Sequence, residues 1–157
     1  PLIQKLILFL GHPAYAFTTV LFSLLLFSGL GSRFSNNLPV RLTTLLLVVY
    51  LCILPFIFSK SIDVAIGFSL PSRILITIVV LSPLGFLMGI PFPAGMQVLG
   101  QKMPSLISWA WGINGATSVV ASIVAAFLAL ETGFNVVLLI GALCYFGVWL
   151  LIPRVFV

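Results

Sequence analysis

Charged side chains are scarce in this sequence, and acidic ones are the scarcest. Its 157 residues include seven Lys or Arg, two Asp or Glu and one His, so that only 6% are charged. A water-soluble domain carries about 25% charged residues, which keep its surface hydrated. Because 62% of the residues are hydrophobic, the lipid bilayer is the natural solvent for this chain.

Groups that catalyse reactions or bind metals are also few. The sequence has no paired carboxylates, no Ser/His/Asp set in visible relation and no phosphate-binding glycine loop of the usual spacing. Cys52 and Cys144 lie inside apolar runs, without a CxxC or Cys/His cluster. We therefore predict that the chain is not an enzyme and holds neither cofactor nor metal.

The net charge of +5 does not indicate a nucleic-acid partner. The basic residues are scattered singly between apolar runs, as expected for interfacial anchors. No Lys/Arg run or aromatic RNA-binding signature is present. The expected partners are the lipid bilayer and other membrane helices or subunits.

Long apolar runs are what the sequence has in abundance. A spanning helix needs about 20 mostly apolar residues, and continuous rather than alternating runs favour helices over strands. We predict an all-α polytopic bundle in which residues 1–157 form one integral-membrane domain. Its five spanning helices are expected near 13–30, 41–58, 72–90, 108–130 and 135–152.

The N-terminal segment Leu2–Leu10 is too short to span. It is expected to be either the end of another helix, a partial sixth, or an interfacial segment. The chain begins at Pro1, without an initiator Met or a signal-peptide pattern. We interpret it as a piece of a longer protein.

Turn residues mark the expected connections at 29–39, 59–72, 91–105 and 131–134. The half-apolar stretch 59–72 is long enough to lie along the membrane interface.

Prolines are expected to shape two of the helices. Pro55 is expected to kink the second helix near its end, and Pro83 to kink the third. Pro91 and Pro93 are then expected to end the third helix.

The basic residues also bear on orientation. Arg33, Arg41, Lys102 and Arg154 fall on one side of the predicted bundle. Lys60 and Arg73 fall on the other, with Lys5 if it lies there. The positive-inside tendency favours the first side as cytoplasmic, which places the C-terminus inside the cell.

Three ionisable residues have two interpretations each. His12, beside Pro13, is expected to cap a helix or lie at the interface, although a neutral imidazole can also ligate haem or a chlorophyll-type pigment. Asp63 and Glu131 fall in predicted loops. There they are solvated acids, whereas at mid-membrane they would suggest an ion path.

The stretch "SPLGFLMGIPFPAG" contains Gly85 and Gly89, one helical turn apart. Glycines at this spacing allow a second helix to approach closely, and this matters in lipid because apolar burial gives no drive for pairing there. A broken helix with Gly and Pro also occurs at the binding sites of transporters. Both interpretations stay open.

The stretch "SWAWGINGATSVVASIVAAF" at 108–127 has recurring small residues. At four-residue spacing they line one side of a helix and are suited to close packing. Trp109 and Trp111 mark the headgroup level at its start. The predicted packing residues of this stretch are Gly112, Gly115, Ala116, Ser118, Ser122 and Ala126.

Asn114 and Thr117 form the candidate polar site. An amide without a partner in hydrocarbon costs several kcal/mol, so Asn114 needs a hydrogen-bond partner. We expect a backbone carbonyl freed by the kinked third helix, or another helix. A bound substrate is the alternative.

Three long stretches carry a family resemblance: "LIQKLILFLGHPAYAFTTVLFSLLLFSGLGS", "GFLMGIPFPAGMQVLG" and "SWAWGINGATSVVAS". Together they resemble the membrane portion of bacterial spermidine-synthase-like proteins, in which major-facilitator-like helices are fused to an aminopropyltransferase-type domain. The resemblance covers Leu2 to about Tyr145 and implies a bacterial inner-membrane location. The glycine-rich nucleotide loop and acidic polyamine-binding residues of the soluble domain have no counterpart here, so no residue inherits that activity.

Three functions follow as hypotheses. The first is a non-catalytic membrane module that anchors a soluble domain or serves as an accessory subunit. The second is a small-solute transporter or transporter half, with Asn114, Thr117 and the broken "GFLMGIPFP" helix along the path. The third is the membrane part of a polyamine aminopropyltransferase-type enzyme, whose catalytic domain is absent from this sequence.

Overall fold

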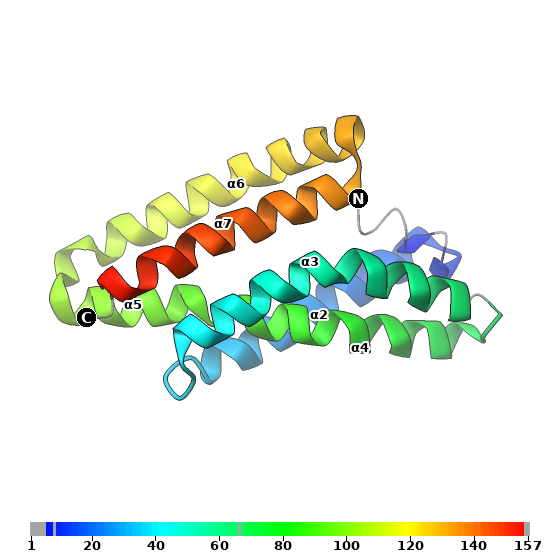
Figure 1. The fold of residues 1–157 in the computed structure, drawn as a ribbon, viewed down its shortest axis with the longest axis horizontal. Helices are drawn as coiled ribbons and strands as arrows, with labels where there is room; N and C mark the ends of the chain where they lie inside the picture. The colour runs from blue at the N-terminus through cyan, green and yellow to red at the C-terminus, as the bar shows by residue number, and fades with distance from the viewer. Residues whose placement is uncertain (1–5, 8, 66, 156–157) are drawn as a thin grey trace.

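The chain is an all-helical bundle in a computed structural model that describes residues 6–7, 9–65 and 67–155. Within these residues it has no strand, and five helical stretches are long and apolar enough to cross a membrane. The bundle is elongated, with its long helices running back and forth along one axis (Figure 1). The expected all-α architecture is confirmed, and it indicates an integral membrane protein.

The helices follow one another with short connections. Their bounds are α2 (Pro13–Arg33), α3 (Val40–Ala65), α4 (Leu70–Met88), α5 (Pro91–Lys102), the 3₁₀ turn η1 (Pro104–Leu106), α6 (Ile107–Thr132) and α7 (Phe134–Val155). Between α6 and α7, Gly133 adopts φ 87°, a conformation that favours glycine. The tight turn expected at 131–134 is therefore present.

Two expected connections are helical instead. Most of 59–72 belongs to α3 or α4, so no long interfacial loop exists there. The stretch 91–105 was also expected to be a connection, but most of it forms α5. Pro91 begins this helix rather than ending α4, because a proline in the first turn loses no helical hydrogen bond and its φ is already helical. The break between α4 and α5 falls at Gly89 and Ile90.

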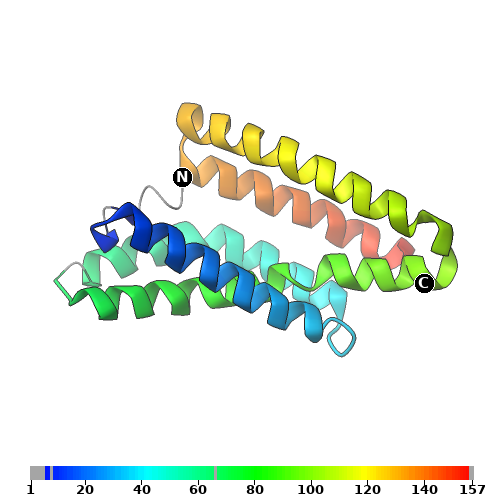
Figure 2. The ribbon, with the colours of Figure 1, turned by 180° about the vertical axis from the view of Figure 1, so that it is seen from behind.

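The long helices pack in a row. α2 lies against α4, α4 against α3, α3 against α7 and α7 against α6, while α5 leads from α4 to the start of α6. Figure 2 shows α2 at the front of one group and the α6–α7 hairpin as a separate pair above it. We call the first group, α2, α3 and α4, the three-helix unit.

The buried core belongs mainly to the three-helix unit. α3 contributes Leu47, Leu51, Leu54 and Phe58, which recur at helical spacing and form one apolar side. α4 adds Leu81 and Leu84, α2 adds Ala16 and Val20, and α7 adds Ala142. The core therefore ends at α7 and does not reach α6, none of whose residues is buried.

The described part of the N-terminal segment packs into this core. Leu6, Phe9 and Leu10 are helical and buried. Arg73 of α4 holds the segment in place, since its Nη1 donates to the Phe9 carbonyl at 3.0 Å and its Nε donates to the Phe68 carbonyl at 2.9 Å. The guanidinium also lies 5.8 Å from the centre of the Phe9 ring.

Candidate functional site

Gly85 of α4 and Gly89, which caps its C-terminal end, face α2 at very close range. A Cβ on Gly85 would lie 3.1 Å from the Cβ of Phe27 and 3.2 Å from the Leu24 carbonyl oxygen. A Cβ on Gly89 would lie 2.8 Å from the Cα of Ser28 and still closer to its carbonyl oxygen. The backbones of the two helices are in contact here, which only glycine permits.

Gly31 of α2 completes this contact and was not among the predicted packing residues. A Cβ there would meet the backbone of Phe86, within 3.3 Å of its Cα. Gly31 was placed in a connection because the stretch 29–39 is rich in turn residues, yet α2 continues through Arg33. Ser28 and Gly31, three residues apart on α2, both meet the backbone of the segment 86–89, and this small-residue spacing could have identified Gly31.

Several polar side chains buried in the three-helix unit are hydrogen-bonded within it. Ser23 donates to the Thr19 carbonyl at 2.6 Å, and Thr44 donates to the Val40 carbonyl at 2.7 Å. Between helices, the Tyr50 hydroxyl of α3 donates to the Val80 carbonyl of α4 at 2.6 Å. These bonds allow hydroxyl side chains to lie between closely packed helices without an unsatisfied group.

Pro83 lacks the N–H that would bond to the Val79 carbonyl one turn earlier. The Ser82 hydroxyl donates to that carbonyl at 3.0 Å. The Val79 carbonyl thus accepts a hydrogen bond from a side chain of its own helix, and no hydrogen bond from Asn114 to it is found among the described residues.

Small residues of α6 lie on a surface that the rest of the chain leaves open. Gly112 and Gly115 have no atom of a neighbouring element within 4 Å of an added Cβ, among the residues that the structure describes. The hydroxyl of Ser118 donates to the Asn114 carbonyl, and that of Ser122 to the Val119 carbonyl. We define the small-residue face as the four exposed residues Gly115, Ser118, Ser122 and Ala126, which recur at helical spacing. Gly112 and Ala116 form a neighbouring row.

The small-residue face therefore packs against no helix of the described chain, in contrast to Gly85 and Gly89. None of the candidate span Pro104–Thr132 is buried. Its expected packing role stays a prediction about another molecule or another part of a longer protein.

Asn114 lies on the other side of α6. It is half-buried, as are Ala110, Ala125 and Leu128 on the same side, which α6 turns toward α5 and α7. Within the described residues its side-chain amide makes no hydrogen bond, while its backbone carbonyl accepts from Thr117 and Ser118.

Thr117, the second candidate polar residue, is exposed, and its hydroxyl also donates to the Ile113 carbonyl at 2.7 Å. Neither Asn114 nor Thr117 lines the two pockets that border the first half of α6.

His12 caps α2. Its Nδ1 accepts from the Ala14 N–H at 3.1 Å, and Pro13 occupies the first helical position. The side chain is exposed and packs edge-on against Tyr15. The expected capping role is thus present.

The two acids lie near helix ends rather than at mid-helix. Both were expected in loops, but Glu131 is exposed in the last turn of α6 and Asp63 falls in the last turn of α3, because each helix continues past its apolar run. Neither is placed as expected for an ion path through the bundle centre.

No family model, no curated protein and no solved structure matches this chain.

Proposed function

We propose that the chain is a non-catalytic integral membrane module whose α6 binds a transmembrane helix of another subunit or of another part of a longer protein. The three-helix unit and α7 form the support, and α6 forms the binding surface. The resemblance stated above adds the proposal that the module anchors a soluble domain in a bacterial inner membrane.

One observation carries this proposal: the small-residue face lies open on a helix that is long enough to span. Exposed Val, Ile and Phe on a spanning helix need no explanation, because lipid tails are equally apolar. Small residues at helical spacing are different, since they gain little from lipid and allow close helix contact. In the same chain, Gly85 and Gly89 make such a contact with α2.

The proposed orientation places Arg33, Arg41 and Lys102 on the cytoplasmic side. These residues lie at the end of α2, the start of α3 and the end of α5, which the antiparallel course of the helices brings to one end of the bundle. The Arg41 guanidinium lies 5.1 Å from the centre of the Trp149 ring in α7. Cations beside aromatic rings at one end are typical of a membrane interface.

Photo-crosslinking in native membranes tests the proposed surface. A benzoylphenylalanine in place of Ser122 is expected to form an adduct with a partner polypeptide. The matched control is the same group in place of Val120, which is exposed on α6 outside the small-residue face. The Ser122 adduct is expected to disappear when Gly115→Leu adds bulk to that face.

Equal adducts at both positions, or none at Ser122, would contradict the proposal. An adduct that persists unchanged with Gly115→Leu would show that the partner is bound elsewhere on α6.

A second candidate function is solute transport, and the amide of Asn114 favours it. This amide is half-buried and makes no hydrogen bond within the described residues, so a polar solute is a chemically suitable partner. Uptake of a panel of small solutes by proteoliposomes separates the two functions. If Asn114→Leu folds normally and abolishes an uptake that Val120→Leu retains, the module is a transporter and the first proposal fails.

A further inference from the structure

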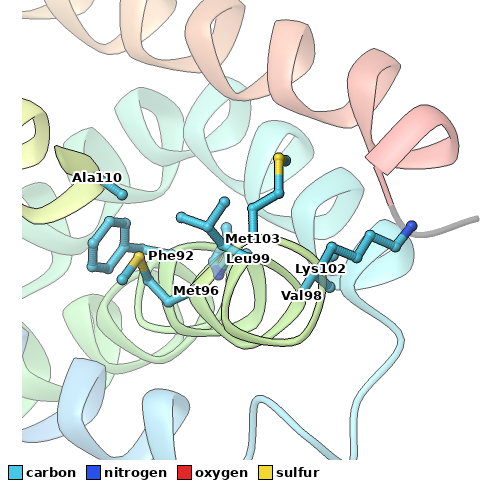
Figure 3. A pocket seen from close by; sticks show the side chains of 9 residues that line it. Phe92, Met96, Val98, Leu99, Lys102, Met103 and Ala110 are labelled. Atoms are coloured by element: carbon cyan, nitrogen blue, oxygen red, sulfur yellow. The ribbon is translucent and has the colours of Figure 1, made fainter. Parts of the chain in front are cut away.

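An apolar groove lies between α5 and the start of α6, away from the small-residue face. Its volume is about 470 Å³, within the range of about 300–1,000 Å³ that is typical of small-molecule sites. Phe92, Met96 and Leu99 of α5 line it, together with Ala110 of α6. Figure 3 shows Phe92 and Met96 near Ala110, with the Lys102 side chain extending away at the other end.

The length of α4 and α5 places this groove at the membrane surface. Leu70–Lys102 contains 33 residues, which at 1.5 Å per residue amount to about 50 Å. The hydrocarbon core is only about 30 Å thick, and α4 alone is long enough to cross it. When α4 spans the bilayer, α5 therefore extends into the headgroup region.

The start of α6 independently places the groove at the depth of the headgroups. Pro104–Thr132 contains 29 residues, which is about 43 Å and also longer than the core. Its first turns carry Trp109 and Trp111, the residue type that concentrates at membrane interfaces. Trp111 lies 5.2 Å, centre to centre, from Phe92 and meets it edge-on, so an aromatic pair lies beside the groove.

The charge at this depth is positive. Lys102 lines the groove and is exposed, and Arg33 and Arg41 lie at the same end of the bundle. The acids Asp63 and Glu131 lie near the far ends of α3 and α6. An apolar groove with a cation at headgroup depth has the composition of an anionic-lipid site.

We propose that the groove between α5 and α6 binds an anionic phospholipid. One acyl chain lies along Phe92, Met96, Leu99 and Met103, and the phosphate group lies at Lys102. Gly95 forms part of the groove wall, and a Cβ added there would meet no atom within 4 Å. This open space accommodates the chain.

Native mass spectrometry of the purified chain in detergent tests the proposal. The probes are phosphatidylglycerol and phosphatidylcholine with identical acyl chains, and inorganic phosphate alone. Retention of phosphatidylglycerol is expected to exceed that of phosphatidylcholine about fivefold, the effect of one Lys near an anionic headgroup. Inorganic phosphate is expected not to be retained, because it lacks the acyl chain.

Two variants assign the binding to this groove. Lys102→Gln is expected to abolish the preference, whereas Arg33→Gln, an exposed cation at the same end, is expected to leave most of it. Gly95→Leu is expected to fill the groove and reduce retention of both lipids several-fold. Gly29→Leu, which also points into open space, is the matched control for that substitution.

Equal retention of the two lipids by the unmodified chain would overturn the proposal. So would an Arg33→Gln effect as large as that of Lys102→Gln, or unchanged retention in Gly95→Leu. Size-exclusion profiles that match the unmodified chain establish that each variant is folded before its retention is compared.

Discussion

Gly89 at the C-terminal end of α4 and Gly115 inside α6 are both glycines in long apolar segments, but their surroundings are opposite. Around Gly89 the backbone of α2 occupies the space that a side chain would need, whereas around Gly115 that space is open. The same contrast extends to the helices themselves. α4 contributes buried residues to the core, and α6 contributes none.

This comparison shows that small residues in a membrane helix can be either already packed against a second helix or left exposed. In the three-helix unit the small residues already make their contact, because Gly31, Gly85 and Gly89 bring α2 and α4 together. On α6 the equivalent contact is absent from the described chain. Apolar burial gives no drive for helix pairing in lipid, so close contact between small residues is what favours it. The exposed small-residue face of α6 is therefore the surface of this chain that is best suited to bind another helix.

The largest expected effect comes from Gly89→Leu. Overpacking costs about 1–3 kcal/mol and occasionally more, and here the clash is with backbone, so we expect a loss of about 3 kcal/mol or more in the free energy of unfolding. Gly115→Leu is the matched control and is expected to change that free energy by less than about 0.5 kcal/mol. Thermal unfolding in detergent measures both, and similar losses would erase the contrast between the two helices.

A smaller effect is expected when Arg73 is replaced by Gln. The change removes charge-assisted bonds to the Phe9 and Phe68 carbonyls, each worth about 1.5–3 kcal/mol. Partial exposure of Arg73 reduces the contribution of these bonds, so we expect the free energy of unfolding to fall by about 2 kcal/mol in total. Denaturant unfolding checks the value against Arg33→Gln, an exposed cation. If both variants unfold alike, Arg73 does not hold the N-terminal segment on α4.

Tyr50→Phe tests the bond that joins α3 to α4. Removing the hydroxyl leaves the Val80 carbonyl without this donor, and we expect a loss of about 1 kcal/mol. Tyr15→Phe is the control, since Tyr15 is half-exposed on α2. A difference between the two melting temperatures is expected, and its absence would mean that water or the helix itself satisfies the carbonyl.

The smallest effect on the chain itself is expected for Ser122→Leu. Its hydroxyl is exposed and bonds only its own helix, so unfolding of the isolated chain is expected to change by less than about 0.5 kcal/mol. The amount of partner that co-purifies with the chain from membranes, which measures assembly, is expected to fall. Intact assembly would contradict the role of the small-residue face, and a large loss of stability would show that Ser122 is packed within the chain.

Helix boundaries were predictable only in part. The bounds near 13–30 and 108–130 lie within one turn of α2 and α6, because both ends are marked by turn residues. The connections at 59–72 and 91–105 were mispredicted for two reasons. A few polar residues do not end a helix, as in the last turns of α3, and a proline can begin one, as Pro91 does.

The candidate sites divide in the same way. The GxxxG spacing of Gly85 and Gly89 directed attention to the right face of α4, but Gly31, its counterpart on α2, was placed in a connection because its neighbours are turn residues. For Asn114 the need for a partner was evident from its place in an apolar run. Which group satisfies it could not be predicted, because a partner from another helix depends on which helices meet. The Val79 carbonyl that Pro83 leaves without its helical donor accepts instead from Ser82 of the same helix.

Composition and periodicity by themselves determined that this chain is a helical membrane protein with five long apolar segments. They suffice because a backbone in lipid must satisfy its own hydrogen bonds, whatever its neighbours are. Only the tertiary structure decided which small residues are used, since close helix contact depends on which two surfaces meet. It placed Gly85 and Gly89 against α2, and left the small-residue face of α6 and the α5–α6 groove open.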